Sequence, residues 1–150
     1  MRLEKESLVV RGIRRQDTAA LAEIQTAITR STANIDFDRL MEVQEKDSED
    51  LSLVGEIDGR IAGFMIAYVL NGGFGLEKSV WIAAMGVSPR FMGQGIGVKL
   101  AEEIFRVCSS KGITRVFTSV RWDSVDLLSF FKTLGFDRSD FINLSKDLDL

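Results

Sequence analysis

The sequence predicts a single α/β domain, residues 1–150, in which helices flank a mixed sheet with three consecutive antiparallel strands. Of its 150 residues, 45% are hydrophobic, which is enough to build one core. Strand and helix patterns follow one another in the order β-α-α-β-β-β-α-β-α-β, and an Asp-Gly pair joins two of the strand patterns. Because no repeat, low-complexity tract or linker interrupts this order, we expect one domain.

The first third of the chain predicts one strand and two helices. Residues Leu8–Ile13 are rich in branched side chains and predict a strand. Asp17 is expected to cap a helix over residues 18–28, in which apolar residues recur at helical spacing. A shorter helix is expected over residues 37–45.

The middle of the chain predicts a hairpin and one further strand. Two strand patterns, Leu51–Ile57 and Arg60–Leu70, flank the pair Asp58-Gly59. This pair favours a tight hairpin turn, because both central residues of such a turn need positive φ. After a glycine-rich break, Val80–Val87 is expected to add a third antiparallel strand.

The last third of the chain predicts two helices and two strands. A helix is expected over residues 98–111 and a strand over residues 115–122. Ser124 is expected to cap a helix that ends at about Leu134, where a glycine follows. A last strand is expected over residues 141–148.

Composition excludes several kinds of chemistry. The chain has no histidine, which removes Ser-His-Asp and Cys-His nucleophile systems and zinc sites that use imidazole. Its one cysteine, Cys108, lies on the apolar side of a predicted helix, so we expect it in the core and expect no metal site. Nineteen basic and 22 acidic residues give a net charge of −3, so no basic field favours nucleic acid.

Hydropathy predicts neither a secretory signal nor a membrane span. Residues 1–6 are charged rather than apolar, and no apolar run approaches the ~20 residues that a transmembrane helix requires. We therefore expect a cytoplasmic protein without a membrane partner.

One segment, MGVSPRFMGQGIGVKLAEEI, suggests chemistry. It places Pro89 and glycines at positions 93, 95 and 97 between a strand and an amphipathic helix. Such a turn exposes unpaired backbone N–H groups at a helix N-terminus, where they attract phosphate. The spacing G-x-G-x-G matches neither the dinucleotide fingerprint nor the P-loop. On glycine spacing alone, a tight turn without a ligand remains an alternative.

A second landmark, FFKTLGF at residues 130–136, lies one strand and one helix downstream. With the glycine loop, it makes nearly the whole chain resemble the GNAT superfamily of N-acetyltransferases. That family has a loop Gln/Arg-x-x-Gly-x-Gly/Ala for acetyl-CoA and a later helix ending in a Tyr-x-x-x-Gly-Phe-like motif. The resemblance implies the acyl-CoA N-acyltransferase fold: a mixed, mostly antiparallel sheet with a splayed parallel strand pair, flanked by about four helices.

The resemblance also implies where acetyl-CoA, the co-substrate, would bind. Its pyrophosphate would lie against the glycine loop and its pantetheine arm along the preceding strand, where Gly86 would let it approach closely. Met92 stands where the family usually has Gln or Arg, and Arg90 would supply the missing charge. Ser124 stands at a position often held by asparagine. The implied set is Met85, Gly86, Val87, Met92, Gly93, Gln94, Gly95, Ile96, Gly97, Val98, Ser124 and Phe131.

The usual catalytic acid and base of the family are not matched. The positions of its glutamate base correspond to Trp81 and Ser119, and the position of its tyrosine acid corresponds to Phe131. Weak catalytic candidates remain in Glu77, Asp123 and Tyr68. A lysine-like amine, with a pKa of about 10.4, is neutral in only about 1 molecule in 2,500 at pH 7, whereas an α-amino group needs far less help.

The resemblance implies a transferase that moves an acetyl group from acetyl-CoA to a primary amine of an unidentified acceptor by direct attack. The alternative is a catalytically weak acyl-CoA-binding or regulatory module of the same fold, since the usual acid and base are missing. Only the first predicts acceptor-dependent release of thiol. The segments expected to shape the acceptor site, residues 31–36 and 71–79, carry no recognisable signature. A homodimer is an expectation from the resemblance alone.

Overall fold

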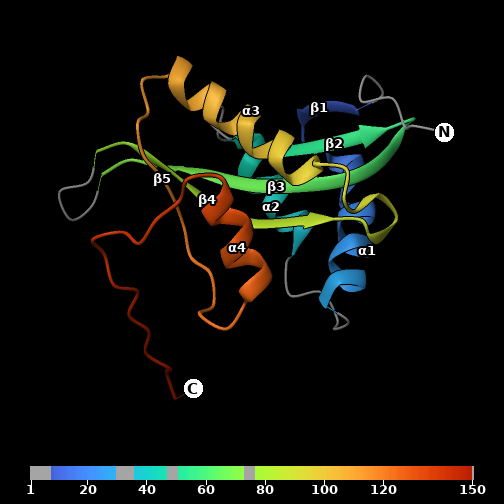
Figure 1. Ribbon diagram of the computed structural model, residues 1–150. Helices are drawn as coiled ribbons and strands as arrows, with labels where there is room; N and C mark the ends of the chain where they lie inside the picture. Colours follow the sequence, from blue (N-terminus) through green and yellow to red (C-terminus); the bar gives the residue numbers. More distant parts are fainter. Residues whose placement is uncertain (1–7, 30–35, 47–50, 73–76, 150) are drawn as a thin grey trace.

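A computed structural model describes residues 8–29, 36–46, 51–72 and 77–149. Five strands form one sheet in chain order, with helices on both of its faces (Figure 1). The strands are β1 (Leu8–Gly12), β2 (Leu53–Ile57), β3 (Arg60–Leu70), β4 (Ser79–Val87) and β5 (Val116–Thr118). The helices are α1 (Thr18–Thr29), α2 (Phe37–Lys46), α3 (Ile96–Ser110) and α4 (Val125–Thr133), with 3-10 turns at Arg15–Asp17 and Pro89–Phe91.

The sheet is mixed, as the sequence predicts. β1 to β4 pair antiparallel, and β5 pairs parallel with β4. β2 and β3 are joined by the expected tight turn, in which Asp58 and Gly59 both have positive φ (50° and 78°). The mixed, mostly antiparallel architecture with a parallel pair at one edge is therefore confirmed.

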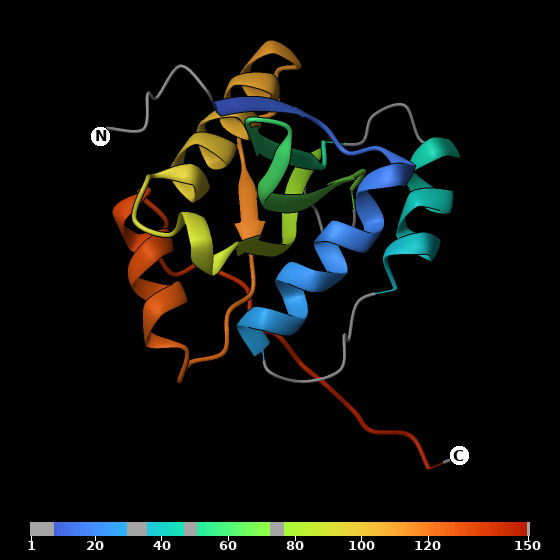
Figure 2. The same ribbon diagram turned by 90° about the vertical axis from the view of Figure 1, so that its right-hand side faces the viewer.

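The two faces of the sheet carry separate apolar cores. α1 and α2 cover one face, and α3 and α4 cover the other, as the edge-on view shows (Figure 2). On the α1 side, Leu21 and Phe64 are fully buried, and Phe37 lies edge-on to Phe64 with ring centres 5.7 Å apart. On the α3 side, Leu100 and Ile104 are fully buried. The sheet is thus fixed from both faces by helices whose apolar sides point inward.

Cys108 lies in the core on the α3 side, as expected from its place on the apolar side of the helix. It is 2% exposed, and burial raises the pKa of its thiol. A buried thiol with a raised pKa is a poor nucleophile. Within the described ranges, no helix combines the length and apolar character needed to cross a bilayer.

The prediction that Asp17 caps α1 is wrong. A 3-10 turn precedes the helix, and the Asp17 carboxylate accepts a hydrogen bond from the backbone N–H of Arg14 (2.7 Å), on its N-terminal side. The same carboxylate accepts two hydrogen bonds from Arg11 (2.8 and 2.9 Å), which also bonds Glu56 (3.1 Å). Asp17 is only 4% exposed, so it ties the end of β1 to the start of α1.

Other bounds also differ from the prediction, such as the start of β2 at Leu53 rather than Leu51. α3 begins at Ile96, two residues early, because Gly95 takes the left-handed conformation at its N-cap. β5 spans Val116–Thr118 rather than residues 115–122, because only these residues pair with β4. The strand expected over residues 141–148 is absent, because this extended segment has no strand beside it in the described part of the chain.

The packing around position 86 leaves no room for a side chain larger than that of glycine. A Cβ built there would stand 2.7 Å from Cε1 of Phe64 and 3.0 Å from Cδ1 of Ile28. We expect Gly86→Ala to lower the free energy of unfolding by about 1–3 kcal/mol, because the core must shift to admit the methyl group. Urea unfolding checks this against Gly12→Ala, whose Cβ would meet nothing within 4 Å. Equal stability of the two variants would contradict the packing.

Candidate functional site

The sheet loses its backbone pairing between β4 and β5. The two strands pair only through Val80–Ile82 and Val116–Thr118. Where this pairing ends, the Thr118 hydroxyl donates a hydrogen bond to the carbonyl oxygen of Ile82 (2.9 Å). β4 continues over residues 83–87, paired with β3 on one side only. The other edge of this stretch has no strand partner among the described residues, so its backbone groups remain available to a ligand.

A β-bulge lies at the start of this stretch. The register of β3 against β4 shifts between Ile66 and Ala67, which leaves Ala83 as the extra residue. A bulge increases the local twist and redirects the residues that follow it. Met85 follows, and its methyl group lies 3.2 Å from where a Cβ on Gly97 would stand. The end of β4 is therefore packed against the beginning of α3.

Two glycines give the loop between β4 and α3 its shape. The chain leaves β4 through Ser88 and the 3-10 turn Pro89–Phe91. Gly93 and Gly95 then have φ values of +81° and +75°, which favour glycine because a Cβ would strain the backbone. A Cβ built at either glycine would meet nothing within 4 Å. The loop therefore presents bare backbone to open space.

The start of α3 carries unpaired backbone donors. The first hydrogen bond of the helix runs from the Lys99 N–H to the Gly95 carbonyl oxygen (3.1 Å). The N–H groups of Ile96, Gly97 and Val98 precede this bond and have no acceptor within the helix. Together with the positive end of the helix dipole, such donors favour a negatively charged group.

α3 lies against α4 at Gly97. A Cβ on Gly97 would stand 3.1 Å from two ring carbons of Phe130. The family resemblance implies Phe131, and not Phe130, at the cofactor. In the structure Phe131 is 5% exposed and packs edge-on against Phe136, with ring centres 5.1 Å apart. Adjacent helical residues point about 100° apart, so only one of the two can face the loop, and the sequence does not show which.

Ser124 is the N-cap residue of α4, as expected, but its side chain makes no capping hydrogen bond. The backbone closes the first turn instead, through a bond from the Leu128 N–H to the Ser124 carbonyl oxygen (3.0 Å). Ser124 is half-buried. Its hydroxyl is thus not committed to capping and can meet a ligand.

The exposed cations near the loop come from the residues that flank it. Arg90 is exposed, and its guanidinium carbon lies 5.9 Å from the centre of the Phe91 ring. Lys99 lies in the first turn of α3, 3.8 Å from Glu102. Met92, at the position where a polar residue was expected, is 63% exposed and offers no charge.

Two of the three catalytic candidates lie away from the end of β4. Tyr68 is opposite Trp81 in the β3–β4 pairing, four residues before Met85. Glu77 is exposed and precedes Met85 by eight residues, which is about 26 Å along an extended chain at ~3.3 Å per residue. The structure therefore does not bring Glu77 to the loop.

The third candidate, Asp123, is committed to an ion pair. Arg121 donates two hydrogen bonds to its carboxylate (3.0 and 2.9 Å). These bonds hold the pKa of Asp123 below its usual range. A carboxylate with a lowered pKa accepts a proton from an amine less readily, which makes Asp123 a weak base.

The positions of the usual glutamate base have no acid–base function here. Trp81 stacks on Phe117 with ring centres 5.1 Å apart, and its buried indole N–H has no hydrogen-bond partner among the residues that the structure describes. Ser119 is exposed on the segment after β5. Neither side chain can remove a proton from an amine at neutral pH.

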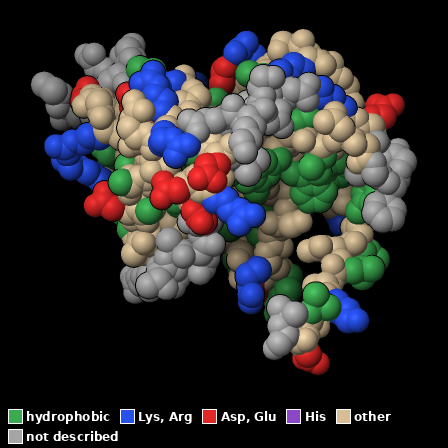
Figure 3. All heavy atoms as spheres, turned by 180° about the vertical axis from the view of Figure 1, so that it is seen from behind, with side chains coloured by type: hydrophobic (Ala, Val, Ile, Leu, Met, Phe, Trp, Pro, Cys, Tyr) green, Lys and Arg blue, Asp and Glu red, His purple; other side chains and the backbone are tan. Residues whose placement is uncertain are grey.

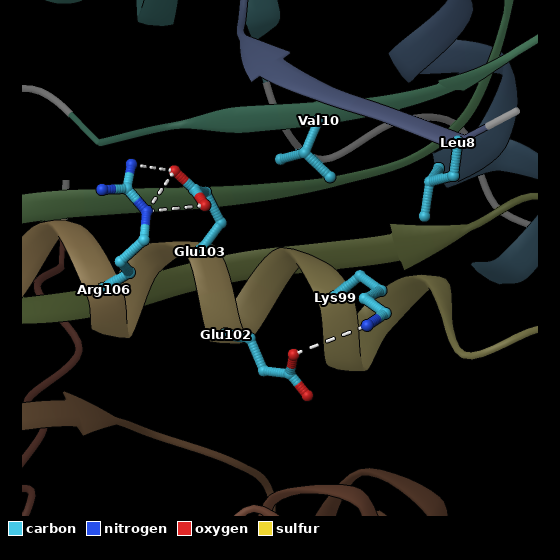
Figure 4. Close-up of a pocket in the computed structure, with 6 residues that line it drawn as sticks. All are labelled: Leu8, Val10, Lys99, Glu102, Glu103 and Arg106. Carbon is cyan, nitrogen blue, oxygen red and sulfur yellow. Dashed lines mark hydrogen bonds and ion pairs between the residues drawn. The ribbon is translucent and has the colours of Figure 1, made fainter. Parts of the chain in front are cut away.

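A cavity of about 400 Å³ between β1 and α3 is not a competing site. It is lined by Leu8 and Val10 and by charged residues of α3 (Figure 4). These charges satisfy one another, because Glu103 pairs with Arg106 and Glu102 with Lys99. Among the residues that the structure describes, no group of three His, Cys, Asp or Glu is placed to hold a metal ion.

The chain is similar to known proteins both in sequence and in structure. The model of a family described as the acetyltransferase (GNAT) family matches residues 18–136, which include α1 to α4 and the glycine loop. An aminoglycoside acetyltransferase from an uncultured soil metagenomic sample superposes with a TM-score of 0.80 at 17% identity, over 97% of this chain and 99% of that one.

Two further structures share the fold. The ribosomal-protein-alanine N-acetyltransferase of Brucella melitensis biovar Abortus 2308 has a TM-score of 0.74 at 16% identity, over 95% of this chain and 99% of that one. An aminoglycoside N-acetyltransferase in complex with CoA has a TM-score of 0.74 at 16% identity, over 93% and 94% of the two chains. At these identities the likeness establishes the fold.

Proposed function

The chain belongs to the GNAT acetyltransferase family, and we propose that it transfers an acetyl group from acetyl-CoA to a primary amine by direct attack. The observation that carries this proposal is the open glycine loop at the start of α3. Gly93 and Gly95 face open space, and three consecutive N–H groups after them lack helical acceptors.

The residues present fit a CoA molecule. The loop amides from Gly93 to Val98 would hold the pyrophosphate, and Arg90 would add positive charge beside it. The unpaired edge of β4 at Met85–Val87 would hold the pantetheine amides by backbone hydrogen bonds, and Ser124 would contribute its hydroxyl. When bound, acetyl-CoA would supply a thioester: the neutral amine nitrogen would bond its carbonyl carbon and release a proton to solvent, and the electron pair of the C–S bond would leave on sulfur as thiolate.

The chain's own contribution is binding and orientation. Backbone N–H groups of the open β4 edge would polarise the carbonyl oxygen of the thioester. These N–H groups are fixed dipoles that would take the place of water around that oxygen. A thiol with a pKa near 8.5 needs only about 1–2 kcal/mol of stabilisation to leave as thiolate at neutral pH, within reach of oriented donors. The side chain of Phe131 cannot donate a proton to it.

This chemistry favours acceptors that are already neutral. An α-amino group has a pKa of about 7.7–8.0, so roughly a tenth of it is neutral at pH 7, whereas a lysine side chain is neutral in only about 1 molecule in 2,500. The similar structures include enzymes named for an aminoglycoside and for a ribosomal-protein alanine. We therefore place peptide α-amines first among the acceptors to be tested and aminoglycosides second.

The test is acceptor-dependent thiol release from acetyl-CoA, measured for a peptide α-amine, a peptide with a blocked N-terminus and one lysine, and an aminoglycoside. Because no enzyme base is assigned, the rate with a lysine acceptor should rise about tenfold per pH unit from pH 7 to 9. The rate with an α-amine should level off near its own pKa of about 8. A shared plateau for both acceptors would reveal an enzyme base and contradict the direct mechanism.

The same assay separates the alternative function. CoA binding without thiol release for any acceptor would favour a catalytically weak acyl-CoA-binding module. This alternative is favoured by one observation: Trp81 and Phe131 occupy the positions of the family's usual base and acid.

A further inference from the structure

Ile28, in the last turn of α1, is an exposed apolar side chain on the inward side of its helix. Leu21, Ile24 and Ile28 recur at i, i+3 and i+7, so they share the side of α1 that faces the sheet. Leu21 is fully buried and Ile24 is 6% exposed, whereas Ile28 is 44% exposed. The protein's own core therefore covers this side of α1 up to Ile24 and leaves Ile28 partly open.

The residue that faces Ile28 from the sheet is Gly86 of β4. A Cβ built on Gly86 would stand 3.0 Å from Cδ1 of Ile28 and 2.7 Å from Cε1 of Phe64, which belongs to the core on the α1 side. The Cα–Cβ direction of Gly86 therefore points toward α1, while its neighbour Met85 packs in the core on the α3 side. Because no side chain rises from Gly86, one flank of Ile28 stays uncovered.

Gly86 lies where the proposed reaction takes place. It belongs to the stretch 83–87 of β4, whose outer edge has no strand partner among the described residues and is proposed to hold the thioester. The glycine loop and Met85 lie toward α3, so CoA would approach from that side and leave the α1 side to the acceptor. Seen from the α1 side, hydrophobic side chains reach the surface beside charged ones (Figure 3).

The three elements that meet at Ile28 carry no charged residue close to it. β4 has none, and the one in β3 is Arg60, four residues before Phe64 and thus about 13 Å away along the strand. α1 has only Glu23, whose spacing of five residues from Ile28 places it about 140° around the helix. A charged group brought here would lose hydration without a partner, whereas an apolar group would cover Ile28.

We propose that Ile28 determines which acceptors are used, by contacting the side chain next to the acceptor amine. This inference rests on the proposed function and narrows it to peptide α-amines whose first residue is apolar, such as leucine. That residue carries its amine and its side chain on one Cα, so the amine can reach the thioester beside Gly86 while the side chain covers Ile28. An aminoglycoside, a hydrophilic polycation, has no apolar group to place there.

The first test compares acetyl transfer to peptides that differ only in their first residue, which is leucine, glutamate or arginine. Thiol release should give a kcat/KM for the leucine peptide at least about tenfold above those for the other two, because only leucine covers Ile28. Equal values for the three peptides would overturn this inference alone. No thiol release with any peptide, from protein that binds CoA, would overturn the proposed function and this inference with it.

The variant Ile28→Glu tests the residue itself. It should reverse the preference and make the arginine peptide the best acceptor, because the new carboxylate attracts the guanidinium group. The control Thr26→Glu adds the same charge to the same turn, at an exposed position about 160° around the helix, and should keep the leucine preference. An unchanged leucine preference in Ile28→Glu, or a loss of rate by one common factor for all three peptides, would contradict the proposed contact.

A smaller substitution, Ile28→Ala, removes the apolar contact without adding a charge. It should raise KM for the leucine peptide about tenfold and that for the glutamate peptide little, because only the leucine side chain loses a partner. Calorimetric titration should give the same CoA affinity as for the wild type, which shows that the variant is folded. An equal rise of KM for both peptides would overturn the role of Ile28 in specificity.

Discussion

Replacing Gly95 with glutamate is expected to weaken CoA binding about a hundredfold, or about 2.8 kcal/mol. Gly95 lies at the N-cap of α3 in the left-handed conformation, with open space where its side chain would start. A carboxylate there would oppose the pyrophosphate that the loop amides are proposed to hold. Like charges facing each other across a binding site cost several kcal/mol. Calorimetric titration with CoA measures the loss.

The matched control for this variant is Gly112→Glu. Gly112 has a φ of +72°, and a Cβ there would also meet nothing within 4 Å. Gly112 lies just beyond the C-terminal end of α3, whereas Gly95 lies at its N-terminal end. Both substitutions add one negative charge and similar backbone strain, and the helix dipole favours the charge at position 95 over that at position 112, so the control should be the less stable of the two. Equal CoA affinity of the two folded variants would contradict the assignment of the loop.

Replacing Asp17 with asparagine is expected to lower the free energy of unfolding by about 1.5–3 kcal/mol. The variant replaces a buried carboxylate by a neutral amide and leaves the part-buried Arg11 guanidinium with Glu56 as its remaining carboxylate partner. The control is Glu56→Gln, which removes the second partner of Arg11 at a more exposed position, where the loss should be about 1 kcal/mol. Urea unfolding at pH 7 measures both.

The effect of Asp17→Asn should depend on pH. Burial raises the pKa of Asp17, but hydrogen bonds from Arg11 and from the Arg14 amide, with the attraction of both guanidinium groups, lower it overall. A carboxyl whose pKa is lower in the folded state stabilises the fold above its unfolded pKa of about 3.9. This contribution is lost as the pH falls through the lower, folded-state pKa. The stability difference between wild type and variant should therefore shrink below about pH 4, and a constant difference would contradict the ion pair.

Local sequence signals predicted most of the fold. The Asp58-Gly59 pair specified the turn between β2 and β3, because few residues adopt positive φ twice in succession. The three glycines after Pro89 indicated the loop before α3, although the exact start of the helix depends on the conformation of Gly95. Helical spacing likewise placed Cys108 in the core.

Features that depend on distant residues could not be predicted. Asp17 was predicted to cap a helix because its neighbours in the sequence fit that role. In the structure its carboxylate is buried and accepts hydrogen bonds from Arg11 instead. The pattern of residues 141–148 is that of a strand, but a strand also needs a neighbour, which sequence periodicity does not supply. In the same way, whether Phe130 or Phe131 faces α3 depends on how α4 packs.

Residues at the acceptor side remain predictions. The segments at 31–35 and 73–76, which include Phe74, lie outside the described residues, so the expected acceptor loops are described only at their flanks. Asn71 and Gly72 are exposed there, and Glu77 and Lys78 follow on the other side.

We propose that backbone amides at the start of α3 bind the phosphates of CoA. Amide NMR spectra of the isotope-labelled protein, recorded during a titration with CoA, test it most directly. The resonances of Gly93, Gly95 and Gly97 should shift in a saturable way, whereas those of Gly59 and Gly112 should stay in place. Binding that leaves the three loop glycines unmoved, or no binding by the folded protein, would contradict the assignment of the site.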